Sequence, residues 1–483
     1  MATPKTSPSA HCPVVAIVGG GFTGAVLAYH LAGLLPEGAA RIVIHEPRAK
    51  LGGGLAYDTD ELVHRINVPA ARMTLVPGDD EHFQRWLFEM DALKDDAQAM
   101  TADGRIFARR SAFGRYVAAQ LQPLLAAGAV EHRRSRVRTV ERDGAGWRVE
   151  AEDGSVLRAD LVVLAATHPS PQAPAALSRA LAGHPRYVAD ATVPGALSAI
   201  GHDHRVLVVG AGLTAADVIA GLEAAGHRGP VTAISRRGLR SRGHAPVSQD
   251  AFGEFAAPPA RSARALLRCV RQTLAEAEAA GITWHAVFDR LRAQGRDIWQ
   301  ALPIAERRRL VRFLRPYWDV HRFRIAPQVE AAIERGLTEG RLVFHAAAIA
   351  DVQRGADEAI DIRLRLRHGR GVLERQFDAV VVTTGPGHGG VLSSQPFLAG
   401  LGAAGLLRPD AVGLGLAVDE ESRAIGADGS VAATLYVAGP LARGTFGELM
   451  GLPQVTEHAV FVAGKVARDM SGLQNRKPVS EPS

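Results

Sequence analysis

Cysteine is scarce in this chain of 483 residues, which contains only Cys12 and Cys269. The two lie far apart in the sequence, and neither belongs to a CxxC pair. This scarcity argues against a disulfide scaffold, a thiolate metal site and a redox-active dithiol, and it favours the reducing cytoplasm as the location. The sequence offers no other cluster of residues typical of a metal site, so we expect no metal.

Lysine and aromatic residues are also few. Only five of the 56 basic residues are lysines, the net charge is +6, and aromatic residues make up 5% of the chain. The basic residues are dispersed, and no basic stripe is interleaved with aromatic side chains, as nucleic-acid recognition would require. We therefore expect no nucleic-acid partner.

Long hydrophobic runs without glycine are absent from the N-terminal region. Residues 13–36 are almost free of charge, but four glycines interrupt them where a strand should turn into a helix. Residues 1–12 have neither the basic region nor the apolar core of a signal peptide. These features predict a soluble intracellular protein with no membrane segment.

The abundant features are apolar residues, at 47%, and glycine, at 51 residues. Domains typically contain about 100–200 residues, so a chain of this length should form two. Glycine in excess often marks turns where the backbone must come close to a ligand. The composition is that of a globular enzyme.

A glycine-rich turn near the N-terminus separates a short β-branched strand from an apolar helix. It has the pattern Gly19-x-Gly21-x-x-Gly24, and the strand after the helix ends at Glu46. Such glycines allow a tight turn, close approach of the backbone to a pyrophosphate and packing of helix on strand, and the acid accepts ribose hydroxyls. The pattern predicts a dinucleotide site.

The pattern recurs in the second half of the chain as Gly210-x-Gly212-x-x-Ala215. The strand that follows ends in arginine instead of an acid. Arginine forms charge-assisted bonds with a 2′-phosphate, so this site should prefer NADPH, unless the arginines are merely solvated surface cations. The residues at this strand end are Ser235, Arg236 and Arg237.

Each glycine turn is followed by a hairpin and then a buried strand, so the chain contains an internal repeat. We predict an α/β fold with two Rossmann-like dinucleotide-binding domains. The first comprises residues 1–195, and the second comprises 196–385 with a helical insertion at about 258–340. Residues 386–483 should return to complete the first domain with one more strand and a helix.

Further motifs occur in order along the chain: Gly52 to Tyr57, Asn67 to Ala70, Arg109-Arg110, Phe113 to Tyr116, Ser235 to Gly238, Tyr317 to Arg322, Gly439-Pro440 and Glu448. Through them nearly the whole chain resembles flavoproteins of the FAD/NAD(P)-binding family that includes bacterial FAD-dependent urate hydroxylases. More distantly, it looks like flavin-containing and N-hydroxylating monooxygenases. The resemblance implies FAD in the first domain and NADPH in the second.

The resemblance also implies the reaction. NADPH would reduce the flavin, and the reduced flavin would add O₂ to give a C4a-hydroperoxide that hydroxylates a small molecule. A flavin reductase or dehydrogenase without oxygen insertion, and a noncatalytic flavoprotein that senses NADPH, remain alternatives. The substrate and the oligomeric state stay open.

Candidate site residues follow from the same resemblance. Asn67 is expected near the flavin, and Gly439 at the FAD site. Arg109 and Arg110 either bind cofactor phosphates or form ion pairs. His64, His168 and His321 are candidates for a general base, although structural roles are commoner for histidine.

The segment from Trp318 to Arg324 is a candidate for substrate binding. Arg322 and Arg324, with His321 and nearby aromatic rings, would suit a planar or anionic substrate such as a purine. The alternative is that the arginines anchor the helical insertion. Two departures from the family pattern, at Ala166 to His168 and at His321 to Arg324, leave room for a different substrate.

Overall fold

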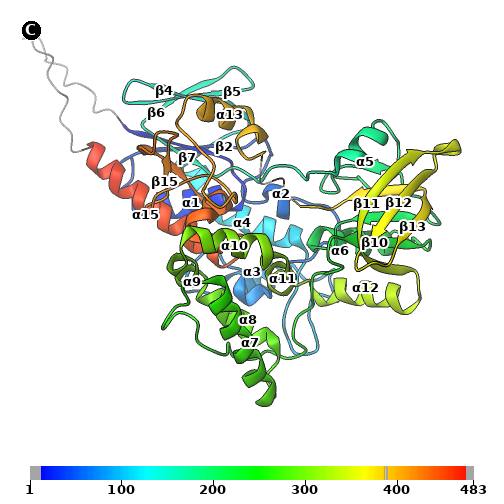
Figure 1. Ribbon diagram of the computed structural model, residues 1–483. Coiled ribbons are helices and arrows are strands. Elements are labelled where there is room, and N and C mark those ends of the chain that lie inside the picture. The colour runs from blue at the N-terminus through cyan, green and yellow to red at the C-terminus, as the bar shows by residue number, and fades with distance from the viewer. Residues whose placement is uncertain (1–11, 386, 388–389, 475–483) are drawn as a thin grey trace, which may run out of the picture.

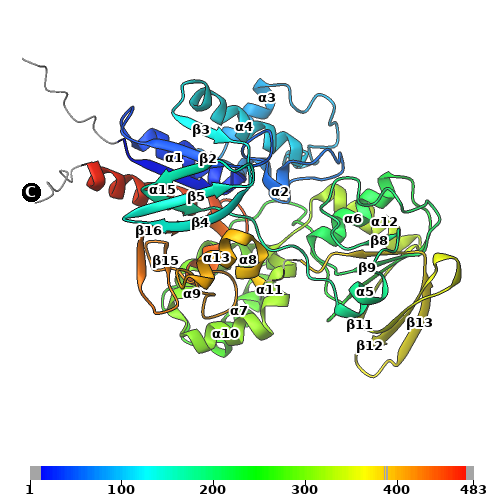
Figure 2. The same ribbon diagram turned by 90° about the horizontal axis from the view of Figure 1, so that it is seen from above.

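The computed structural model describes residues 12–385, 387 and 390–474. Two sheets of mainly parallel strands lie on opposite sides of the molecule, and a group of helices lies below the first sheet (Figure 1). The view from above shows the same three parts around a common centre (Figure 2). The predicted α/β fold with two Rossmann-like sheets is confirmed. The expectation that residues 1–12 are not a signal peptide concerns a segment of which residues 1–11 lie outside the described part.

The first sheet has the strand order β15-β16-β7-β1-β2-β3, and only the β15–β16 pair is antiparallel. One parallel strand of this sheet, β16, comes from the C-terminal part of the chain: Leu435 to Val437 of β16 pair with Val162 to Leu164 of β7. The strands are β1 (Val14–Val18), β2 (Arg41–His45), β3 (Val130–Arg133), β7 (Leu161–Leu164), β15 (Arg423–Ile425) and β16 (Val431–Val437).

Both faces of the first sheet are covered, which explains its nearly continuous apolar strands. Val15 and Ile17 of β1 pack toward helices, whereas Val14, Ala16 and Val18 pack toward an antiparallel three-stranded sheet. The helices are α1 (Phe22–Leu34), α4 (Arg110–Ala126) and α15 (Gln454–Gln474), and the three strands are β4 (Val137–Asp143), β5 (Gly146–Ala151) and β6 (Val156–Ala159). Smaller elements of this lobe are α2 (Gly54–Tyr57), η1 (Ala70–Arg72), α3 (His82–Glu89), η4 (Leu392–Ser394), α13 (Pro396–Ala403), η5 (Gly439–Ala442) and α14 (Arg443–Phe446).

The second sheet has the order β13-β12-β11-β10-β9-β14-β8, with β12 and β13 forming an antiparallel hairpin. Helix α6 (Leu213–Ala224) joins β9 to β10, as α1 joins β1 to β2. The strands are β8 (Tyr187–Val188), β9 (Val206–Val209), β10 (Val231–Ser235), β11 (Leu342–Arg354), β12 (Ile360–Leu366), β13 (Val372–Phe377) and β14 (Ala379–Val382); the remaining short elements are α5 (Ala175–Ala180) and η2 (Ala356–Glu358).

The predicted insertion is helical, but its last helix does not pack with the others. Helix α12 (Pro327–Thr338) contacts α6 and β11, so it is the crossover helix between β10 and β11. The other helices share a small core of their own around Leu266, Val287 and Ile298. They are α7 (Ala263–Ala279), α8 (Trp284–Ala293), α9 (Gly295–Ala301), α10 (Ile304–Phe313) and α11 (Arg315–Arg322). The exact domain boundaries at 195 and 385 stay predictions.

Candidate functional site

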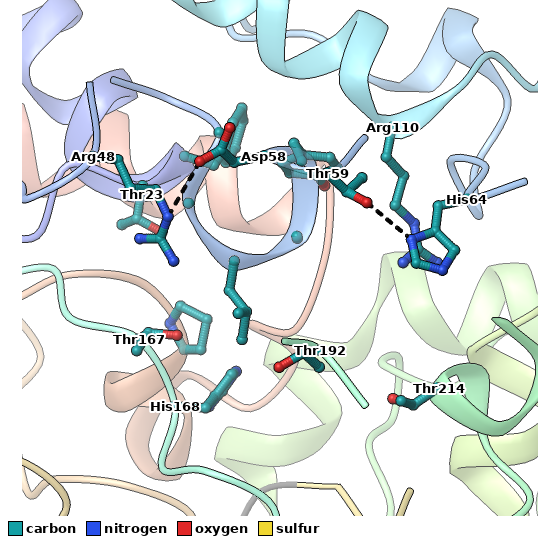
Figure 3. A pocket seen from close by; sticks show the side chains of 18 of the residues that line it. Thr23, Arg48, Asp58, Thr59, His64, Arg110, Thr167, His168, Thr192 and Thr214 are labelled. Atoms are coloured by element: carbon teal, nitrogen blue, oxygen red, sulfur yellow. Dashed lines mark hydrogen bonds and ion pairs between the residues drawn. The ribbon is translucent and has the colours of Figure 1, made fainter. Parts of the chain in front are cut away.

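The first sheet with its covering elements forms one lobe, and the second sheet with its helices forms another. One cleft of about 830 Å³ is lined by residues of both lobes. Its wall includes the first glycine turn, the start of α6 in the second lobe, the connection at residues 191–197, and residues near 322 and 450. Figure 3 shows side chains from several of these segments pointing toward one space, among them Thr23, His168 and Thr214. Its volume is at the upper end for a ligand pocket.

At the first glycine turn, no side chain separates the backbone from a ligand in the cleft. Gly19 has a φ of +104°, and a Cβ there would lie 2.5 Å from the carbonyl oxygen of Ala165. A Cβ at Gly24 would overlap the carbonyl oxygen of Gly19, which fixes how closely α1 packs on the turn. No side chain caps α1 at Gly21, and its first turn contains no acid. The free amides and the positive helix end therefore suit a phosphate.

The second turn repeats these features. Gly210 has a φ of +129°, and a Cβ there would overlap Thr383. Helix α6 begins at Leu213, after Gly212, without a side-chain cap and without an acid in its first turn, and its residues Leu213 and Thr214 line the cleft. Ala215 is buried in the helix. Two helix N-termini that suit a phosphate therefore face one cavity.

Glu46 lies at the end of β2 in the cleft wall and is only 4% exposed. Its Oε2 accepts a hydrogen bond from the Gly20 amide at 3.1 Å, and its Oε1 accepts from the amide and guanidinium of Arg48. The carboxylate is thus fixed in place and can still accept further hydrogen bonds. Its contact with a ribose stays a prediction.

The predicted NADPH residues at the end of β10 differ in their freedom. Ser235 Oγ donates to the Leu239 carbonyl, and Arg237 donates to the Phe313 carbonyl while lying over the ring of Tyr317. Arg236 is exposed and has no hydrogen bond or ion pair to any described residue. Arg236 is thus the one of the three whose side chain is unengaged, although none of the three is in the cleft lining, and its contact with a 2′-phosphate stays a prediction.

Arg110 joins the two lobes instead of facing the cleft alone. It forms an ion pair with Asp217 of α6, with 2.8 Å between Nη1 and Oδ2, and it donates to the Arg65 carbonyl. His64 is adjacent, hydrogen-bonded to Thr59, and burial lowers its pKa (Figure 3). This arrangement favours the ion-pair role of Arg110, whereas Arg109 contacts Asp96 and the Asp95 carbonyl.

One part of the cleft wall, formed by residues 66–68, 73, 322–324, 450–452 and 455, contains several apolar side chains; we call it the apolar compartment. Charged residues such as Asp58, Asp60 and Glu61 line the cleft elsewhere. Asn67 lines it, and its carboxamide makes no hydrogen bond to a described residue. Arg322 and Arg324 also reach this wall, but each is paired with an acid, Glu448 and Asp289 respectively. Its lining is Ile66 to Val68, Met73, Arg322 to Arg324, Met450 to Leu452 and Val455.

The other candidates lie at different distances from the cleft. His168 lines it, and burial lowers the pKa of its imidazole to about 4. His321 is outside the lining, stacked on Phe288 with its Nδ1 hydrogen-bonded to the Tyr317 carbonyl. Gly439 is also outside, but it packs against Thr23 and holds Pro440 in the wall.

Asp217, Glu448 and Asp289 matter more to the site than sequence reasoning indicated. Asp217 had a detectable signal, because it is the only charged residue in the first turns of an otherwise apolar helix. Glu448 stood in a recognised motif, but its partner Arg322 could not be read from the sequence. Asp289 had no signal among the other charged residues of its helix.

Residues 16–169 match the profile of a family described as FAD-NAD(P)-binding. The matched segment contains the first glycine turn, Glu46 and Asn67. This part of the chain is therefore an FAD/NAD(P)-binding domain, as predicted. No curated protein matches the chain in sequence.

Several solved structures share the fold over nearly the whole chain. The ornithine hydroxylase of Pseudomonas aeruginosa in its reduced form is 16% identical, with 95% of this chain and 99% of that chain covered and a TM-score of 0.63. The L-lysine 6-monooxygenase of Pseudomonas syringae is 19% identical, with coverages of 96% and 100% and a TM-score of 0.60. The FAD-bound cadaverine monooxygenase of Erwinia amylovora is 15% identical, with coverages of 97% and 98% and a TM-score of 0.61. These likenesses establish the fold, and none of them concerns a urate hydroxylase.

Two further findings apply to the described residues alone. They contain no group of three or more histidine, cysteine or acidic side chains able to hold a metal ion. Within the same ranges, no helix has both the length and the apolar character needed to cross a bilayer.

Proposed function

We propose that the protein is an FAD-dependent, NADPH-consuming monooxygenase that hydroxylates the nitrogen of a small amine. The observation that carries the proposal is that two uncapped helix N-termini, each after a glycine turn, face the same cleft. A hydride donor at one turn and a flavin at the other can then meet without leaving the protein. The activities named for the three similar structures, on ornithine, lysine and cadaverine, support an amine as substrate.

The chain's own residues would bind the two cofactors and exclude water. The α1 amides and Glu46 suit the pyrophosphate and ribose of FAD, and the α6 amides with Arg236 suit NADPH. The Arg110–Asp217 ion pair holds the second lobe against the first, and the apolar compartment keeps the reaction dry.

Bound FAD would supply the redox chemistry. The overall reaction would be RNH₂ + NADPH + H⁺ + O₂ → RNHOH + NADP⁺ + H₂O. The amine must be unprotonated before it can accept oxygen. His168 lies in the cleft wall, but the lowered pKa of about 4 makes its imidazole a weak base, so the amine would enter the site in its neutral form.

The test is a measurement of stoichiometry on the purified holoprotein. The protein should be yellow and release FAD rather than FMN. With a suitable amine, NADPH consumed, O₂ consumed and hydroxylamine formed should be equal, with little hydrogen peroxide. A reductase would instead need an added electron acceptor, and a sensor would hardly turn over; either result would contradict the proposal.

A further inference from the structure

Arg322 lies in the wall of the apolar compartment with most of its hydrogen-bonding capacity unused. Its side chain is 5% exposed, and only its Nε donates to a described residue, at 2.9 Å from Oε1 of Glu448. Nη2 lies 2.9 Å from the same oxygen but is buried without a hydrogen-bond partner, and Nη1 donates to no described residue. The N–H groups of both Nη atoms are therefore unpaired in a buried guanidinium.

The backbone at Gly451 leaves room beside these donors. Gly451 lines the cleft together with Arg322. A Cβ added to Gly451 would lie 3.4 Å from Nη2 of Arg322 and within 4 Å of no other described atom beyond the adjoining residues. The absence of a side chain at this position therefore leaves space for a ligand atom next to Nη2.

Arg292 brings a second buried positive charge to the same wall. Its guanidinium donates to two neutral oxygens, the Leu452 carbonyl and the side-chain oxygen of Gln454. Burial and the neighbouring Arg322 lower its pKa to about 9, so it is still protonated at pH 7. The carboxylate of Glu448 interacts with it electrostatically but is already the partner of Arg322. One acid therefore serves two buried cations.

The second carboxylate of this wall is shared as well, because Asp289 lies 3.0 Å from Arg324 and 4.0 Å from Arg72. The acids among residues 58–61 also line the cleft, but they are exposed, so solvent screens their charge. Arginine thus outnumbers carboxylate around Arg322. The cations are Arg72, Arg292, Arg322 and Arg324, and the carboxylates are Asp289 and Glu448.

We propose that the two Nη atoms of Arg322 form a binding site for an oxyanion, and that the amine substrate carries a carboxylate that occupies it. The inference rests on the proposed function. A carboxylate here would pair buried donors and offset the excess of positive charge, whereas a neutral chain would leave both uncompensated. The planar fork of a guanidinium also matches a carboxylate, which accepts two parallel N–H bonds.

Pentylamine, cadaverine and 5-aminopentanoate form a matched test series, because all three carry a terminal amine on a five-carbon chain. Their far ends are a methyl group, an ammonium group and a carboxylate. On the FAD holoenzyme, we expect the affinity measured from flavin absorbance, and the kcat/KM for NADPH-dependent O₂ uptake, to be at least about tenfold higher for 5-aminopentanoate than for the other two. Equal binding of pentylamine and 5-aminopentanoate would overturn the inference.

Two variants test whether Arg322 causes this difference. Arg322→Lys keeps a charge for Glu448 but loses the planar fork, whereas Gly451→Ala leaves the ion pair in place and puts a methyl group 3.4 Å from Nη2. Each should lower the affinity for 5-aminopentanoate at least about tenfold and leave that for pentylamine unchanged. Gly464→Ala in α15, where a Cβ would meet nothing within 4 Å, is the matched control and should change neither affinity.

Carboxylate selectivity that survives both variants would overturn the site at Arg322, and Gly451→Ala alone decides this if Arg322→Lys does not retain FAD. Acetate separates a carboxylate on the substrate from a free one. It should compete with 5-aminopentanoate and leave pentylamine turnover unchanged; acetate that raised pentylamine turnover to the rate of 5-aminopentanoate would overturn the assignment to the substrate. The proposed function fails separately: carboxylate-selective binding without any hydroxylamine formed would refute the monooxygenase while leaving the oxyanion site intact.

Discussion

Three glycine-to-alanine variants can separate two reasons for a glycine at position 19: its positive φ and its close approach to the Ala165 backbone. Gly33 lies within helix α1 and Gly38 in the following loop, and a Cβ at either would meet open space. Gly38 has a φ of +73°, however, so alanine there is strained, at a cost of about 1–2 kcal/mol. Gly19→Ala adds to such strain a methyl group 2.5 Å from the Ala165 carbonyl oxygen, and overpacking costs about 1–3 kcal/mol more.

Gly33→Ala should therefore raise the free energy of unfolding by up to about 1 kcal/mol, because alanine is the better helix former. Gly38→Ala should lower it by about 1–2 kcal/mol, and Gly19→Ala by about 2–5 kcal/mol, the sum of the two costs. Urea unfolding measures these values, and FAD retained after gel filtration reports on the site. Only Gly19→Ala should lose FAD. Equal effects of Gly19→Ala and Gly38→Ala would show that contact with the neighbouring strand does not shape the turn.

Three other predictions concern NADPH, the lobe contact and acid stability. Arg236→Ala should weaken NADPH about 10- to 150-fold and leave NADH unchanged in binding titrations, whereas Arg237→Ala, whose guanidinium is already engaged, should affect both cofactors alike or neither. Arg110→Met and Asp217→Asn should show a coupling of about 1–3 kcal/mol in a double-mutant cycle on unfolding; strict additivity would deny the ion pair any role. His244 is neutral in the fold down to a pKa of about 3, so the unfolded chain binds more protons below about pH 6.5 and stability falls as pH falls through this window. His244→Gln should reduce that slope between pH 6.5 and 4, and an unchanged slope would assign the acid loss to other groups.

The parts of the fold that sequence predicted are those determined by neighbouring residues. The strand, glycine turn and helix around Gly19 and Gly210 depend on local patterns of apolar residues and on backbone freedom, and both lie where expected. The pairing of Arg322 with Glu448 depends instead on how the insertion docks on the return segment. Residues far apart in the chain meet there, and an arginine in the sequence carries no sign of its partner. The sequence suggested that Arg322 and Arg324 either bind an anionic substrate or anchor the insertion; the contacts of Arg324 favour the anchor, whereas Arg322 also keeps donors unpaired.

The two glycine turns also differ in a way that their similar sequences hide. At the first turn, a Cβ on Gly21 would lie 3.4 Å from the backbone of Gly54, so the start of α2 packs beside that turn. At the second, a Cβ on Gly212 would meet nothing within 4 Å, so the start of α6 is open. The first turn therefore has a second backbone segment beside it, whereas no described atom lies within 4 Å of a Cβ added to Gly212 at the second. This asymmetry is what the proposed reaction requires, because a flavin must stay bound through many cycles while NADPH is exchanged in each.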